Sequence, residues 1–106
     1  MNEDMDGLCC EVYKALAHPA RVKIIDLLRE GERCVCELAP LVGVSDSNLS
    51  QHLGLLRKSG LVATRREGHS IYYRIGSPAV LELSEKVREV VLGRLSSMAA
   101  AMKGTG

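Results

Sequence analysis

The stretch from residue 45 to residue 75 limits what this chain can fold into more than any other part of it. Its sequence is SDSNLSQHLGLLRKSGLVATRREGHSIYYRI. Ser45 is suited to cap a helix over residues 46–59, because Ser is favoured at the N-cap position. The apolar residues of that segment recur at spacings of four and three, which puts Leu49, Leu53 and Leu56 on one buried helix face. We therefore predict an amphipathic helix at the centre of the fold.

A β-hairpin is expected directly after this helix. Gly60 ends the helix, and strands are predicted over residues 61–66 and 70–75, where β-branched and aromatic residues are frequent. The expected turn is Glu67-Gly68-His69, because Gly68 can adopt the positive φ that a tight hairpin turn requires.

Apolar spacing and helix start and stop signals indicate four more helices. They cover residues 8–17, residues 19–30 beginning at Pro19, residues 34–41 ending before Gly43, and a long segment from Pro78 onward. Two short helices separated by a glycine-containing turn form the pattern of a helix-turn-helix. The predicted fold is mainly α with a small β-hairpin, in the order helix-helix-helix-helix-strand-strand-helix.

The length of 106 residues allows one domain, because the chain is too short for two. Residues 1–7 and 103–106 are expected to be disordered. The three aromatic residues are all Tyr, so the core has to be aliphatic. The first and last helices carry more apolar surface than one small core can use, which predicts a homodimer through these two helices. The alternative is that both pack back on their own subunit.

The beginning of the chain is acidic and lacks the basic and apolar regions of a signal peptide. No apolar run approaches the length of a membrane span. We therefore expect a cytoplasmic protein with no membrane partner, in which disulfides are not the usual state of cysteine.

Residues 45–75 also carry the chemistry expected of a DNA-binding surface. Opposite its leucines, the helix presents short neutral hydrogen-bonding side chains of the kind that read base edges in the major groove. Between residues 57 and 74 there are five Lys or Arg against one acid, which suits phosphate contact by the helix end and the hairpin. The predicted contacts to double-stranded DNA are Ser47, Asn48, Gln51, His52, Lys58, Arg65, Arg66 and His69. The alternative is an ordinary solvated helix and hairpin.

The four cysteines are Cys9, Cys10, Cys34 and Cys36. In a cytosolic protein they bind metal, sense redox state or pack in the core. Thiolates select soft ions, including As(III), Sb(III), Cd(II) and Pb(II), and a helix start beside Arg33 favours the thiolate of Cys34. Residues i and i+2 of a helix point about 200° apart, so Cys34 and Cys36 would share one ion only if the first turn unwinds.

From roughly residue 8 to residue 98, the chain resembles the ArsR/SmtB family of winged helix-turn-helix metal-sensing repressors. KALAHPARVKIIDLL resembles the family's opening helices, SDSNLSQHLGLLRKSGLV its recognition helix and TRREGHSIYYRI its wing. ERCVCEL is similar to the family's thiolate metal box, a C-x-C pair between acidic residues. The resemblance implies a homodimeric repressor that leaves its operator when a soft metal or metalloid ion binds, with no organic cofactor.

The thiolate set departs from the family pattern at one position. Ala39 stands where arsenic-sensing members often have a third cysteine. A third thiolate would therefore come from Cys10 or Cys9, as in some cadmium- and lead-sensing members. Cys9 is expected on the buried face of its helix, which favours Cys10, from the same subunit or its partner.

Two other departures concern histidines. The family's second type of metal site, built from His and carboxylates on the last helix, cannot form because residues 78–106 contain no His. His18 stands where members often have Asp, which implies a weaker helix cap. The three histidines suggest no acid–base cluster, so an enzyme is not expected.

Two further functions remain open from the sequence. A redox-sensing repressor would join Cys34 or Cys36 to Cys9 or Cys10 in a disulfide. A dimeric interaction module that does not bind DNA would tolerate substitution of its polar helix face and basic hairpin.

Overall fold

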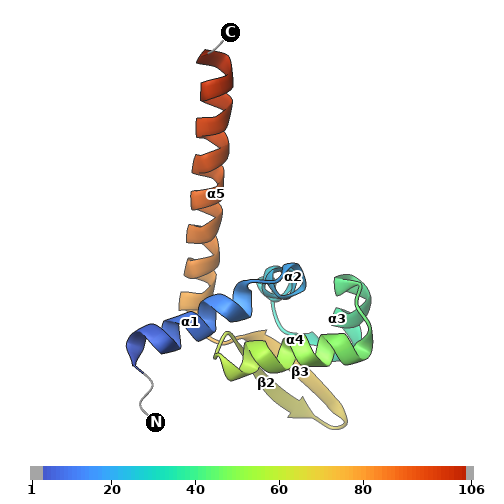
Figure 1. Cartoon of the computed structure of the whole chain (residues 1–106). Coiled ribbons are helices and arrows are strands. Elements are labelled where there is room, and N and C mark those ends of the chain that lie inside the picture. Colours follow the sequence, from blue (N-terminus) through green and yellow to red (C-terminus); the bar gives the residue numbers. More distant parts are fainter. Residues whose placement is uncertain (1–3, 105–106) are drawn as a thin grey trace.

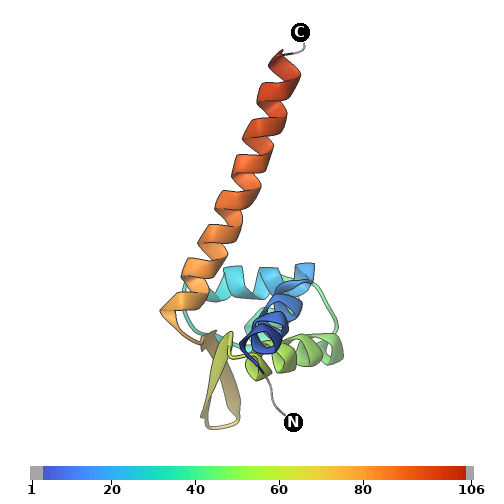
Figure 2. The same ribbon diagram turned by 60° about the vertical axis from the view of Figure 1, so that its left-hand side comes forward.

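The computed structural model describes residues 4–104, and its elements follow the order α1, α2, β1, α3, α4, β2, β3, α5 (Figure 1). Their bounds are Met5–Leu16 for α1, Pro19–Leu28 for α2, Arg33–Cys34 for β1, Val35–Val42 for α3, Asp46–Lys58 for α4, Val62–Glu67 for β2, Ser70–Ile75 for β3 and Pro78–Gly104 for α5. Helices α1–α4 and the sheet form one body, from which α5 projects as a long rod (Figures 1 and 2). The predicted mainly α architecture with a hairpin is confirmed.

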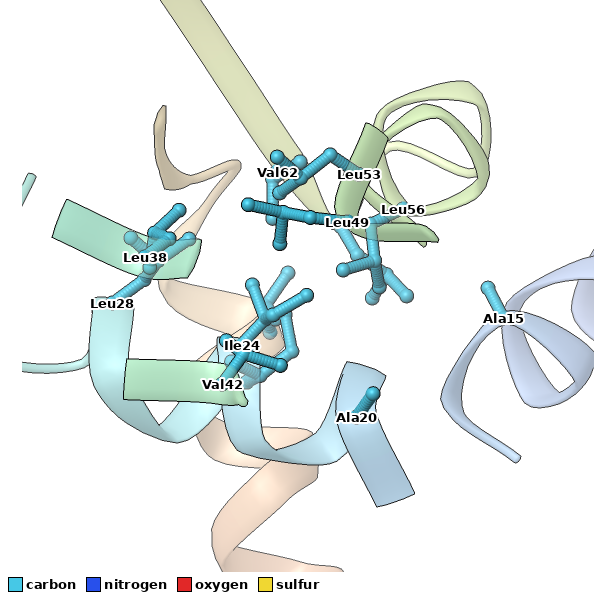
Figure 3. Close-up of a cluster of buried hydrophobic side chains, with 13 residues drawn as sticks. Ala15, Ala20, Ile24, Leu28, Leu38, Val42, Leu49, Leu53, Leu56 and Val62 are labelled. Atoms are coloured by element: carbon cyan, nitrogen blue, oxygen red, sulfur yellow. The ribbon is translucent and has the colours of Figure 1, made fainter. Parts of the chain in front are cut away.

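Aliphatic side chains from all five helices and from β2 form the core (Figure 3). The residues with at most 2% exposure are Ile24, Ile25, Leu28, Leu38, Leu49, Leu53 and Leu56. The three leucines of α4 therefore lie on its buried face, as their spacing predicted. Each such side chain contributes about 1.5–3 kcal/mol on burial, so this face fixes how α4 sits on the body.

The sheet has three strands in the order β1-β3-β2, one more than the sequence predicted. Residues Arg33 and Cys34 form the extra strand β1 and pair with Tyr73 and Tyr72 of β3. Two residues are too few to show the alternation that identifies a strand. Because Cys34 belongs to β1, helix α3 begins at Val35 and not at Cys34, as the sequence had predicted.

The start of the chain is more ordered than predicted. Helix α1 begins at Met5, and Asp4 caps it by accepting a hydrogen bond from the Gly7 amide at 2.8 Å. At the other end, α5 continues through residue 104. The expectation of disorder is therefore wrong for residues 4–7 and 103–104. Its remaining part, 1–3 and 105–106, lies outside the described residues. An acidic stretch without apolar spacing still supplies a good helix cap.

Helix α5 is attached to the body near its beginning by ion pairs and a hydrogen bond. Arg88 binds Asp26 of α2 at 2.8 Å, and Arg29 of α2 binds Glu85 and Ser84 of α5. Farther along, apolar side chains are exposed: Val87, Val90, Val91, Leu92, Leu95, Met98 and Met102. An apolar groove of about 510 Å³ runs between α5 and α2. Within residues 4–104 no helix is apolar enough over the necessary length to cross a membrane.

Candidate DNA interface and cysteine site

Helix α4 lies in the body, away from the free tip of α5 (Figures 1 and 2). Ser45 caps the helix by accepting a hydrogen bond from the Asn48 amide at 3.2 Å. With the leucine face buried, the predicted reading residues Ser47, Asn48, Gln51 and Lys58 are all exposed. These four side chains are therefore accessible on the solvent side of α4, and their contact with DNA stays a prediction.

His52 does not share this position. It is half-buried, its Nδ1 accepts a hydrogen bond from Arg21 at 3.2 Å, and its ring lies 4.5 Å from the ring of His18. Burial, followed by the charges of His18 and Arg21, holds the pKa of His52 below its ordinary value. The prediction of His52 as a DNA contact therefore lacks geometric support: this side chain joins α4 to α2. Its contact with His18 links residues 34 positions apart, which no local pattern reveals.

Two cationic side chains that lie beside Lys58 were not predicted from the sequence. Lys14 and Arg21 line a pocket of about 240 Å³ between α1 and the end of α4, together with Lys58 and Glu11. Arg21 donates from Nε to the Ala15 carbonyl at 2.6 Å and from Nη2 to the Lys14 carbonyl at 3.3 Å. These acceptors are neutral, so the positive charge of Arg21 extends the basic surface around Lys58.

The hairpin β2–β3 projects from the body beside α4 (Figure 1). Gly68 has φ 63° at its turn, and Arg66 and His69 are exposed near the tip. Arg65 differs from these two, because its guanidinium binds Glu32 at 2.7 Å and Glu67 at 2.7 Å. Hydrogen bonds from Arg65 lower the pKa of Glu32.

The charge of Arg65 is thus balanced within the chain. The prediction of Arg65 as a direct phosphate contact loses support, whereas that of Arg66 and His69 keeps it. No local pattern indicates this ion pair, because Glu32 is 33 residues from Arg65 along the chain.

Cys34 is the N-cap of α3, with φ −71° and ψ 149°. Its Sγ accepts a hydrogen bond from the Cys36 amide at 3.2 Å, and Glu37 accepts one from the Cys34 amide at 3.1 Å. The two sulfurs are joined in a Cys34–Cys36 disulfide. The prediction that the pair can meet only if a helical turn unwinds is therefore wrong, because Cys34 lies outside the helix.

Cys9 and Cys10 are free and exposed on α1. The expected burial of Cys9 is not found in the single chain. Helix α1, which carries these two cysteines, and helix α3, which begins directly after Cys34, lie on opposite sides of the body (Figure 1). Accordingly, no group of three or more Cys, His, Asp or Glu within residues 4–104 is placed to hold a metal ion. The redox alternative predicted a disulfide from Cys34 or Cys36 to Cys9 or Cys10. The disulfide in the structure joins Cys34 to Cys36 instead.

Helices α3 and α4, followed by a basic hairpin in a three-stranded sheet, define a winged helix-turn-helix DNA-binding protein. Residues 18–64 match the family model described as bacterial regulatory protein, arsR family. Together with the relatives below, this match shows that the chain belongs to the arsR family. It is a DNA-binding transcriptional regulator and not an enzyme.

The uncharacterized HTH-type transcriptional regulator Rv0081 of Mycobacterium tuberculosis is 44% identical over 103 residues, covering 96% of this chain and 90% of that protein. Its crystal structure has a TM-score of 0.85 over 92% of this chain and 99% of that one. The homodimeric winged helix-turn-helix DNA-binding domain Mb0332 of Mycobacterium bovis, solved by NMR, is 36% identical, with a TM-score of 0.80 over 91% and 93% of the two chains. The cadmium resistance transcriptional regulatory protein CadC homolog of Staphylococcus aureus is 42% identical over 77 residues, or 72% of this chain and 64% of that protein.

Proposed function

We propose that this regulator is a homodimeric, cytoplasmic repressor that binds a two-fold operator. Ser47, Asn48 and Gln51 are exposed on α4 and suited to base edges. Lys58, Arg66 and His69 are exposed around them and suited to the phosphates. In a dimer, two such surfaces would read half-sites about one helical turn apart, roughly 34–36 Å.

The exposed apolar side chains support dimerisation. The outer part of α5 and the adjoining groove against α2 are apolar, and the groove is large enough to take side chains of a second copy. Leu8 of α1 is also 42% exposed. Mb0332 is described as a homodimer. The alternative in which α1 and α5 pack back on their own subunit leaves this surface uncovered.

The effector we propose is a soft metal or metalloid ion, As(III)/Sb(III) or Cd(II)/Pb(II), bound by the reduced thiolates of Cys34 and Cys36. The observation that carries this proposal is the meeting of the two sulfurs at the N-cap of α3, the first helix of the DNA-binding motif. The residues of one chain fit only part of such a site. Cys10 or Cys9 would supply the third ligand, and the distance between α1 and α3 within one chain favours the partner subunit.

Binding at this position is suited to regulation. Cys34 supplies both the cap of α3 and part of β1, so a ligand on its sulfur changes the contacts of both elements. An ion that binds the thiolates more tightly in the DNA-free conformation lowers DNA affinity through that difference. The similarity to the CadC homolog is consistent with a metal effector.

A redox-sensing repressor is the second candidate, and the Cys34–Cys36 disulfide is the observation that favours it. In that reaction the two thiols lose two protons and two electrons to an oxidant such as a peroxide, and an S–S bond forms. The disulfide also removes both thiolates from metal binding, so the two effectors would compete for the same sulfurs.

A DNA-release titration separates the candidates. Reduced protein on operator DNA is titrated with arsenite, Cd(II), Pb(II) and diamide. Metal sensing predicts release by a metal under reducing conditions, loss of release in Cys36→Ser, and unchanged DNA binding by that variant. Redox sensing predicts release by diamide alone.

The paired variant Cys9→Ser/Cys10→Ser is the control for the third ligand. It should weaken the metal response and leave the diamide response intact. If Cys36→Ser still responds to every reagent, the sensor lies elsewhere. If Gln51→Ala and Arg66→Ala leave function unchanged, the chain acts as an interaction module instead.

A further inference from the structure

Glu32, the residue directly before β1, reaches across the sheet to the hairpin. Its two carboxylate oxygens accept hydrogen bonds from Nε of Arg65 at 2.9 and 2.8 Å, and Nη2 of Arg65 lies 2.7 Å from Oε1. Arg65 is in β2, and β3 lies between β1 and β2. This ion pair therefore spans the central strand and ties the hairpin to the segment that carries the cysteines.

Tyr72 of β3 completes the connection. Its Cα pairs with Cys34 on one side and with Arg65 on the other. Directly opposed residues of antiparallel strands project from the same face of a sheet, and the guanidinium of Arg65 lies 4.5 Å from the centroid of the Tyr72 ring. One row of residues thus crosses the three strands: Cys34, Tyr72 and Arg65. Glu32 lies two residues before Cys34 and binds Arg65, so it connects the two ends of this row.

We propose that Glu32 is a positioning residue of the DNA interface, which transmits the state of the Cys34 sulfur to the wing through Arg65. The inference rests on the proposed function, in which the cysteines sense the effector. The backbone of Cys34 is the backbone that pairs with Tyr72, so a change at the sulfur that displaces Cys34 also displaces Glu32. Arg65 follows its carboxylate partner, and the neighbouring Arg66 is re-aimed with it.

Arg65 has a second carboxylate partner that provides a matched control. Glu67 binds Nη1 of Arg65 at 2.7 Å, but it belongs to β2 itself and is only two residues away. Glu32→Gln and Glu67→Gln each remove one negative charge beside Arg65, so their direct electrostatic effects on DNA binding have the same sign. Only Glu32→Gln removes the ion pair that spans β3.

The experiment measures operator affinity of reduced protein, and of the same protein treated with arsenite, Cd(II) or diamide. The quantity compared is the ratio of the two affinities, since allosteric couplings usually amount to about 5–150-fold. We expect this ratio to shrink at least about fivefold in Glu32→Gln and to stay at the wild-type value in Glu67→Gln. Affinity of the reduced proteins should change in the same direction in both variants, so the response ratio is the quantity that separates them.

Arg65→Gln breaks the same connection from the other side and is the second variant. We expect it to lose the response as Glu32→Gln does, and the double variant to lose no more than either single one. Thermal unfolding confirms that each protein is folded. If Glu32→Gln responds like wild type, the inference is wrong and the proposed function stands. If wild-type protein responds to none of the three reagents, the proposed function fails, and the inference fails with it.

Discussion

The two helices of the DNA-binding motif begin with the same device built from different atoms. In α4 the cap is an oxygen, since Ser45 Oγ accepts the Asn48 amide at 3.2 Å. In α3 it is a sulfur, since Cys34 Sγ accepts the Cys36 amide at 3.2 Å. An oxygen cap is chemically inert, whereas a sulfur cap can be oxidised or bound by a soft ion. The motif is thereby divided into a helix that reads DNA and a helix whose start depends on thiol chemistry.

The buried faces of the two helices, in contrast, should contribute similarly to stability. This prediction has the largest expected effect. Leu38 of α3 and Leu53 of α4 are 0% and 2% exposed. We expect Leu38→Ala and Leu53→Ala each to lower the free energy of unfolding by about 2–5 kcal/mol. Urea unfolding at one fixed protein concentration measures both, because dimer stability depends on concentration. A much smaller loss for Leu38→Ala would mean that α3 is loosely packed, and that the two helices differ in more than their caps.

The sequence revealed the reading helix well, because its signals are local. The leucine spacing, the Ser45 cap and the hairpin glycine all act within one or two turns of the chain. The cysteine segment was less predictable. Strand β1 forms only because β3 is there to pair with it, so the location of Cys34 outside the helix depends on a contact with Tyr72, far along the chain.

Individual side chains of the site show the same limit. The exposed positions of Ser47, Gln51 and Arg66 follow from helix and hairpin periodicity, and the structure agrees with them. The partners of Arg65 and His52 were not predicted, because Glu32 and Arg21 are about 30 residues away from them in sequence. Residue type and spacing show which face of an element a side chain lies on, but not which distant group has already bound it.

The caps themselves give the second prediction, of intermediate size. Ser45→Ala should lower the free energy of unfolding by about 1 kcal/mol, equally in reduced and oxidised protein. Under reducing conditions Cys34→Ser should be at least as stable as wild type, because a hydroxyl oxygen is a stronger acceptor than a thiol sulfur. Cys34→Ala, which has no acceptor, is the control and should be the least stable of the three Cys34 proteins. Chemical unfolding with and without reductant measures all of them. A Cys34→Ser protein as unstable as Cys34→Ala would show that the sulfur does not act as a cap.

The smallest effect concerns how the reading helix is attached to the rest of the body. His52 binds Arg21 through an unprotonated Nδ1 and lies against His18. The pKa of His52 is lowered from 6.5, so the unfolded chain binds its proton at a higher pH than the folded chain does. The contribution of His52 to stability is therefore complete above pH 6.5 and declines as the pH falls below that value.

His52→Gln removes this titration. We expect its melting temperature to fall less steeply than that of wild type between about pH 7 and pH 5, because the remaining slope comes from other groups. His69→Gln, at the exposed hairpin turn, is the matched control and should keep the wild-type slope. Equal slopes for wild type and His52→Gln would show that the imidazole is protonated as readily in the folded protein as in the unfolded chain. In that case the contact with Arg21 would not hold α4 against α2, and packing of its leucine face alone would position the reading helix.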